Sequence, residues 1–319
     1  MPSDSYPYAV GRIKGLERSL LNAQDFSRMV EQPLSAAIKH LADLGYGQHA
    51  EDKSDPDFLV AAEMKALRLA IDELTPAKPL TDLFWLEQDA VNLKLLLKAR
   101  LLGEDVPDAN LAFGLYPQET LREAVSQKDY TALGAPLAEG LTALEALLRK
   151  GDREVSPFEI STAVDNAVYA HIFCNKKNTF VKNFFSAKVD FTNILSFLRA
   201  RKLGWDKAKF TATLLAGGQL PVLQFQNAYE LPSGEAEVSL PRGSAYDSAL
   251  RQALGVALTE DGSIAAASNI LSQKLMELAA AERFDSFGIG PIVYYLFRKI
   301  EEGKKLRVLF AQKRSGEVQ

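Results

Sequence analysis

Residues 89–103 read DAVNLKLLLKARLLG, and residues 190–204 read DFTNILSFLRARKLG. Seven of the 15 aligned positions are identical, at a constant offset of 101 residues. A third and fainter copy covers residues 302–316, where an acid, a leucine, a base and a glycine are in register. Similarity at a fixed spacing indicates repeated structural units. We therefore interpret the chain as an internal repeat with three copies.

Each copy has the same physical plan. An amphipathic helix precedes the acidic residue, and a base stands in the predicted last turn, namely Arg100, Arg201 or Lys313. A cation there opposes the negative end of the helix dipole. A glycine follows, and glycine suits the left-handed conformation that commonly ends a helix. Each copy is therefore predicted to be the second half of a long helix.

Periodicity extends the helical interpretation to the whole chain. Apolar residues recur every three or four positions along 180–198, which puts them on one face of a helix. Further helices are predicted upstream of each copy, over 57–74, 159–174 and 268–282. Strand patterns are confined to the short segments 219–225 and 238–241, each beside glycine or proline. The predicted fold class is all-α.

The order of the copies predicts how the lobes are built. Short, similar pieces follow the first two copies, at 119–125 and 221–225, but the third copy ends at the C-terminus. The N-terminal piece 24–30 can complete it. We expect one body over residues 1–319 with three similar lobes, forming a funnel about an axis. The approximate lobes are 53–150, 151–262, and 263–319 completed by 1–52.

Composition argues against several classes of protein and partner. The net charge is −4 and the pI about 5.6, which argues against nucleic acid as the main partner. The hydrophobic fraction of 47% is ordinary for a soluble globular protein, and no apolar run reaches the roughly 18 residues of a membrane span. A single cysteine, Cys174, excludes an intramolecular disulfide and fits a reducing cytoplasm.

No set of residues builds an active site. His171 and Cys174 have the spacing of two zinc ligands on one helical turn, but further ligands are missing nearby, so a packed helix is the better interpretation. The glycines of 288–291 have no P-loop context and fit a helix start with proline in its first turn. We expect no catalytic residue, metal or cofactor. Asp89 and Asp190 we interpret as polar contacts that fix how two helices cross.

Cations at the ends of the three repeated helices are the candidate binding residues. They could contact acidic groups on a partner, or could only offset the helix dipoles. The candidates are Lys98 and Arg100 in the first copy, Arg199, Arg201 and Lys202 in the second, and Lys313 and Arg314 in the third.

The chain resembles the C subunit of the prokaryotic V/A-type ATPases, whose counterpart in the eukaryotic V-ATPase is the d subunit. The motifs that carry the resemblance span nearly the whole chain. They are YAVGRI at 8–13, LGYG at 44–47, the copies at 92–100 and 190–204, and GPIVYYLFRKIEEGKKLRVL at 290–309. The chain departs from the family pattern at Lys305, where an Asn is usual, at Gly303 within the predicted helix, and in a divergent stretch at 230–244.

The resemblance implies a function that the residues alone do not. Family members are all-helical, non-catalytic subunits of the central stalk. They join the shaft formed by the D and F subunits to the membrane ring of proteolipid subunits, and so couple ATP turnover to H⁺ or Na⁺ translocation. The expected location is the cytoplasmic face of the membrane, held through protein contacts. The alternative is a helical-repeat scaffold that binds another protein helix in its concave surface. A small-molecule enzyme is a third, weaker alternative.

Overall fold

We describe the protein from a computed structural model that covers residues 6–108, 111–150, 155–174 and 178–316. Helix accounts for 73% of the structure, and the described residues contain no β-strand. The predicted all-α fold class is therefore confirmed. The predicted boundary between the first two lobes, at residues 150 and 151, falls where the described residues stop.

The helices are α1 (Tyr6–Leu16), η2 (Glu17–Ser19), α2 (Ala23–Glu31), α3 (Leu34–Asp43), α4 (Pro56–Leu74), α5 (Lys78–Leu102), α6 (Gln118–Gln127), η4 (Thr131–Leu133), α7 (Leu137–Lys150), α8 (Pro157–Cys174), α9 (Thr179–Lys202), α10 (Lys207–Thr211), α11 (Val222–Ala228), α12 (Ser233–Ser239), α13 (Asp247–Ala257), α14 (Ile264–Ala281) and α15 (Gly290–Ser315). The three repeat copies form the C-terminal parts of α5, α9 and α15. Residues 219–225 and 238–241, with their weak strand pattern, contribute to α11 and α12 or lie beside them.

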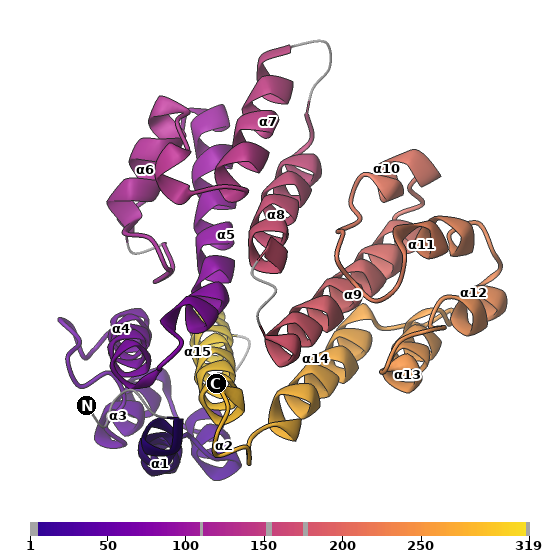
Figure 1. Cartoon of the computed structure of the whole chain (residues 1–319). Helices are drawn as coiled ribbons and strands as arrows, with labels where there is room; N and C mark the ends of the chain where they lie inside the picture. Colours follow the sequence, from indigo (N-terminus) through magenta and orange to yellow (C-terminus); the bar gives the residue numbers. More distant parts are fainter. Residues whose placement is uncertain (1–5, 109–110, 151–154, 175–177, 317–319) are drawn as a thin grey trace. The chain divides into compact units, whose positions relative to one another are not determined.

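The chain divides into two compact units. The first combines residues 1–82 with 279–319, so that both ends of the chain belong to it, and the second contains residues 83–278. Figure 1 shows α15 among the N-terminal helices of the first unit. The boundary between the units, at residues 82 and 83, lies within the predicted lobe 53–150, and the three lobes stay a prediction.

Helix ends in the first unit follow from local sequence. Asp55 caps α4 by accepting a hydrogen bond from the backbone N–H of Asp57, and Pro56 occupies the first turn. α15 begins at Gly290 and Pro291, as predicted, and ends before Gly316, whose φ is 78°. Gly103 and Gly204 also have positive φ, so glycine ends all three repeated helices as predicted.

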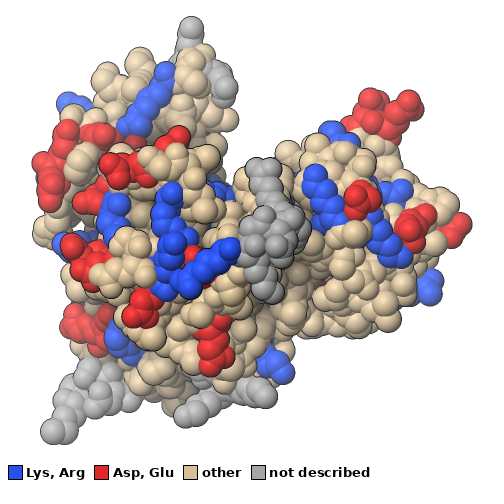
Figure 2. All heavy atoms as spheres, turned by 90° about the horizontal axis from the view of Figure 1, so that it is seen from above, with Lys and Arg blue, Asp and Glu red and all other residues tan. Residues whose placement is uncertain are grey.

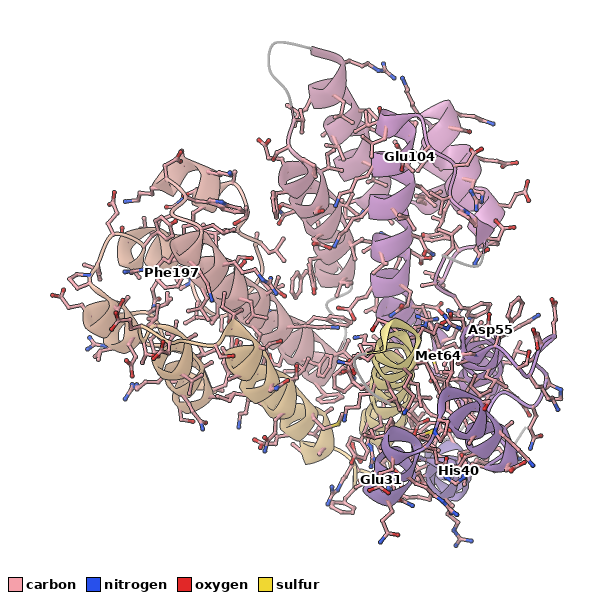
Figure 3. The ribbon with its side chains drawn as sticks, turned by 180° about the vertical axis from the view of Figure 1, so that it is seen from behind. Glu31, His40, Asp55, Met64, Glu104 and Phe197 are labelled. Carbon is pink, nitrogen blue, oxygen red and sulfur yellow. The ribbon has the colours of Figure 1, made fainter. Side chains whose placement is uncertain are left out.

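Gly303, where the chain departs from the family pattern, is buried in α15 and faces α4. A Cβ at this position would lie 3.4 Å from the side chains of Val60 and Met64 on α4. Figure 3 shows Met64 on α4 beside α15. A distance of 3.4 Å is an ordinary van der Waals contact, so Gly303 faces α4 at a position where a small side chain would also fit.

The apolar face of α9 forms the centre of the second unit. Phe184, Ala187, Phe191, Ile194 and Leu198 are all buried, as the periodicity predicts.

The N-terminal part of α9 meets α5 through residues at equivalent repeat positions. The rings of Phe84 and Phe185, each five residues before its repeated acid, lie 4.9 Å apart. Glu87 and Lys188, one turn further along, form an ion pair. The two helices are thus joined near the start of their repeated halves.

Candidate functional site

The repeated acid of α5 binds the backbone of the segment that leads into α6. Asp89 is fully buried and accepts a hydrogen bond from the Leu115 N–H at 2.8 Å. Asn92, one turn later, pairs with the backbone of Ala112 in both directions, at 2.7 and 2.8 Å. These bonds give buried backbone groups of an irregular segment the partners that they need.

The same arrangement recurs on α9. Asp190 accepts hydrogen bonds from the N–H groups of Gln219 (2.8 Å) and Leu220 (3.2 Å), which precede α11. Asn193 pairs with the backbone of Leu215 at 2.8 and 2.9 Å. Asp190 also accepts a hydrogen bond from the hydroxyl of Tyr246, the residue before α13. The acid of the second copy therefore positions two helices.

A glycine makes each of these contacts possible. A Cβ on Gly114 would lie 1.9 Å from Oδ1 of Asp89, and a Cβ on Gly218 would lie 1.9 Å from Oδ1 of Asp190. No side chain fits at that distance, so only glycine lets the segment reach the carboxylate. Sequence reasoning missed both glycines, although each is followed within three residues by the proline before a short helix.

The repeated bases bind the far ends of the same short helices. Arg100 donates to the carbonyl of Val125, in the last turn of α6, and its other nitrogen lies 2.6 Å from the buried carboxylate of Glu145. Arg201 donates at 2.7 Å to the carbonyl of Leu231, beyond the end of α11. Carbonyls at the end of a helix have no partner within the helix, so the cations satisfy them.

The third copy binds the backbone at both ends of the N-terminal helix α2. Glu302 on α15 accepts a hydrogen bond from the Leu21 N–H at 2.7 Å, just before α2 begins. Lys313 donates to the carbonyls of Val30 (2.8 Å) and Gln32 (2.7 Å) at its end. We call the three pairs Asp89 with Arg100, Asp190 with Arg201, and Glu302 with Lys313 the acid–base clamps.

The third clamp differs from the other two in the residue that lies three positions after the acid. Lys305 stands where the first two copies have Asn92 and Asn193, and it is exposed, whereas both asparagines are fully buried. Before the acid, the third copy adds Lys299, which is 1% exposed and lies 2.7 Å from the carboxylates of both Glu302 and Glu63.

Burial and neighbouring charges shift the pKa values of two of these groups, Asp190 and Lys299. Burial raises the pKa of Asp190 to about 6, although its hydrogen bonds from Tyr246, Gln219 and Leu220 act in the opposite direction. Burial alone would lower the pKa of Lys299, but the carboxylates of Glu302 and Glu63 hold it above its ordinary value. Lys299 is therefore a charged group inside the first unit.

The interpretation of Asp89 and Asp190 as contacts between two crossing helices needs correction. Both carboxylates bind backbone N–H groups of irregular segments instead. The physical reason is that backbone N–H groups in a buried irregular segment need an acceptor, and a carboxylate is a strong one. The backbone N–H groups within a helix are already paired and need no such acceptor.

The seven candidate cations fall into two groups. Arg100, Arg201 and Lys313 belong to the clamps, and Lys98 donates to the Ser161 hydroxyl at 2.8 Å. The exposed cations are Arg199, Lys202 and Arg314, of which Arg314 pairs with Asp55 and Asp57 at 2.7 Å. Binding of a partner by any of them stays a prediction.

The described residues contain no group of three or more His, Cys, Asp or Glu placed to hold a metal ion. His171 lies within α8, where burial lowers its pKa, and Cys174 is exposed at the end of that helix. The acids of the clamps accept hydrogen bonds from backbone N–H groups, and their bases donate to backbone carbonyls.

Comparison with known proteins identifies the family. The family model described as ATP synthase (C/AC39) subunit matches residues 9–318. The chain belongs to this family. The match includes all three clamps, and it extends from α1, which begins at Tyr6, to the end of α15.

Individual proteins similar to this chain are C subunits of A-type ATP synthases, at low sequence identity. The C subunit of the A-type ATP synthase of Thermococcus gammatolerans is 25% identical over 95% of this chain and 85% of its own length. That of Methanosarcina acetivorans is 23% identical, over 98% and 89% respectively. That of a Desulfurococcus species is 24% identical, over 95% and 85%.

Among the described residues of this C/AC39 chain, we find no helix with the length and apolar character to cross a membrane.

Proposed function

We propose that this chain is a non-catalytic central-stalk subunit of a rotary V/A-type ATPase. In this role it forms a socket that joins the shaft of the D and F subunits to the membrane proteolipid ring, at the cytoplasmic face, and couples ATP turnover to ion translocation. The observation that carries the proposal is the family match over residues 9–318. The relatives, each named as the C subunit of an A-type ATP synthase and matched along most of its length, support it.

We also propose that the three lobes are structurally equivalent and surround an axis. The clamps support this, because each long helix uses an acid and a base eleven residues apart to hold a short helix at both ends. The third short helix, α2, comes from the N-terminus and lies in the same unit as α15. The proposed third lobe is therefore completed by the beginning of the chain.

A rigid socket is what torque transmission needs. A short helix fixed at only one end can swing, whereas one held at both ends keeps its orientation under load. Eleven helical residues span roughly 16 Å, which matches a helix of about ten residues with its flanking turns. The clamps thus provide stiffness, and the exposed cations are the candidates to contact partners.

Purification of the chain through an affinity tag, from the organism that encodes it, tests the function. We expect the head, shaft and ring subunits to copurify. Removal of the chain should leave ATP hydrolysis by the head while ATP-driven ion transport is lost. Recovery of an unrelated helical protein, without ATPase subunits, would contradict the proposal and favour the scaffold alternative.

A further inference from the structure

The end of α9 and the adjoining α10 carry an excess of positive charge. Residues 199–209 contain five cations and one carboxylate. The repeat-equivalent residues 98–108, at the end of α5, contain two cations and three carboxylates. Figure 3 shows one of these carboxylates, Glu104, at that end of α5. The two equivalent ends therefore differ in the sign of their charge.

Some of the five cations are already used within the fold. Arg201 belongs to the second clamp, and Lys207 forms an ion pair with Glu230 at 2.7 Å. Arg199 and Lys202 are exposed, and neither forms an ion pair with another described residue. Lys209 is also exposed, and its Nζ lies 4.5 Å from the centre of the Trp205 ring. Three cations are thus available to an incoming group.

Apolar side chains lie beside these cations. The rings of Trp205 and Phe158 meet edge to face at 5.0 Å, and 53% of Phe158 is exposed. Leu203, 61% exposed, separates Lys202 from Gly204. Figure 2 shows several Lys and Arg side chains gathered on the lobe that contains α9 and α10, with Asp and Glu among them.

An aromatic cluster, in which Phe197 and Phe210 are buried and Tyr229 is half-buried, supports this surface. The ring centre of Phe197 on α9 lies 5.8 Å from that of Phe210 on α10 and 5.9 Å from that of Tyr229. The rings of Phe210 and Tyr229 are stacked, with their centres 4.2 Å apart. The Tyr229 hydroxyl also donates to the Trp205 carbonyl at 2.6 Å. The surface is therefore preorganised, which lowers the entropic cost of binding.

We propose that residues 199–209, together with Phe158, form a docking site for an acidic segment of a partner protein within the rotary complex. Carboxylates of that segment pair with Arg199, Lys202 and Lys209, and an apolar side chain packs on Phe158 and Trp205. The inference rests on the proposed function and deepens it. Because the equivalent end of α5 carries carboxylates, the same acidic segment does not suit both, and the partner's charged contact falls on the end of α9 and not on that of α5.

The density of charge at this site favours a protein, rather than a membrane surface, as its partner. Segments that bind anionic lipids usually present about four to eight clustered cations. Here three are available, and the carboxylates of Asp206 and Glu230 stand among them. Such alternation matches a partner with a few placed acids better than it matches a uniform anionic surface.

Charge reversal tests the site. We compare the tagged wild-type chain with Arg199→Glu/Lys202→Glu and with the neutral Arg199→Gln/Lys202→Gln. The matched control is Lys182→Glu/Arg251→Glu, which makes the same charge change at exposed positions of the same unit. Retention of the shaft and ring subunits is measured at about 50 mM and about 300 mM salt, where screening differs strongly. Circular dichroism verifies that each variant is folded.

We expect the reversal to lower retention at least about tenfold at low salt, the neutral variant to lower it less, and the control to behave as wild type. Equal retention by wild type, reversal and control overturns the docking site while leaving the proposed function intact. Absence of ATPase subunits from the wild-type purification overturns both. Loss of binding to phosphatidylglycerol vesicles, with subunit retention unchanged, overturns the docking site in favour of a membrane contact.

Discussion

Asp190 and Arg201, three turns apart on α9, hold opposite ends of the same short helix. The carboxylate accepts backbone N–H groups ahead of α11, and the guanidinium donates to a carbonyl beyond it. α11 therefore runs in the same direction as α9, with an anion at the positive end of its dipole and a cation at the negative end. The same polarity holds for α6 on α5 and for α2 on α15.

The raised pKa of Asp190 predicts a pH-dependent stability. The unfolded value is near 3.9 and the folded value about 6, so the native state binds the proton more tightly. This contribution is complete below about pH 4 and is lost as the pH rises through about 6. Relative to Asp190→Asn, the wild type should lose about 2 kcal/mol of unfolding free energy between pH 4 and pH 7. Urea unfolding across this range measures the difference, and parallel pH curves would contradict the prediction.

Asn193 should matter for stability where Lys305 does not. Asn193 is fully buried and pairs twice with the Leu215 backbone, so Asn193→Ala leaves two buried groups without partners. We expect a loss of about 2 to 4 kcal/mol in the free energy of unfolding. Lys305→Ala at the equivalent, exposed position should change it by less than about 0.5 kcal/mol. Chemical denaturation of both variants checks the pair, and equal effects would show that the exposed lysine is also structural.

Arg100 should be essential to its lobe, because Glu145 depends on it. Glu145 is 3% exposed and binds both Arg100 and the Tyr130 hydroxyl at 2.6 Å. Arg100→Met leaves a buried carboxylate without its cation, which costs about 3 to 5 kcal/mol. The double variant Arg100→Met/Glu145→Gln should recover part of that loss. Arg199→Met, at an exposed position nearby, serves as the control and should unfold as the wild type does.

The N-terminal segment should loosen when the third clamp is removed. Glu302→Gln/Lys313→Met removes the carboxylate that faces the Leu21 amide and the ammonium that binds Val30 and Gln32. Backbone amides of α2 should then exchange with deuterium at least about tenfold faster, while those of α6 and α11 are unchanged. Hydrogen-exchange mass spectrometry resolves the three helices. Uniform acceleration would mean global destabilisation, and no acceleration would mean that the clamp does not hold α2.

Gly218 should not tolerate a side chain. A Cβ there would meet the Asp190 carboxylate at 1.9 Å, so Gly218→Ala must displace the segment that leads into α11. We expect a loss of about 1 to 3 kcal/mol. Gly11→Ala is a suitable comparison, because nothing lies within 4 Å of its Cβ and it is exposed within α1. That variant should be neutral or more stable by up to about 1 kcal/mol, and thermal melts of the two distinguish them.

Local pattern was enough to predict most of the long helices of this protein, whereas the segments that contribute to α11 and α12 showed a weak strand pattern. The period of three to four residues placed α4, α8, α9 and α14 to within a few residues, because an apolar face has to be buried wherever the helix packs. Positive φ at Gly103, Gly204 and Gly316 was also predictable, since glycine adopts that conformation at little cost. The repeat itself indicated that Asp89 and Asp190 share one role.

Only the tertiary structure decided what that role is. The partners of Asp190 lie 29 to 56 residues away, and the backbone N–H group that Glu302 binds lies 281 residues away, at Leu21. No periodicity connects positions so far apart, because which buried amides lack partners depends on how irregular segments pack. The same holds for the cations. Arg199 and Arg201 look alike in sequence, but one faces solvent and the other satisfies a carbonyl beyond α11, because residues two positions apart project about 200° apart around a helix axis.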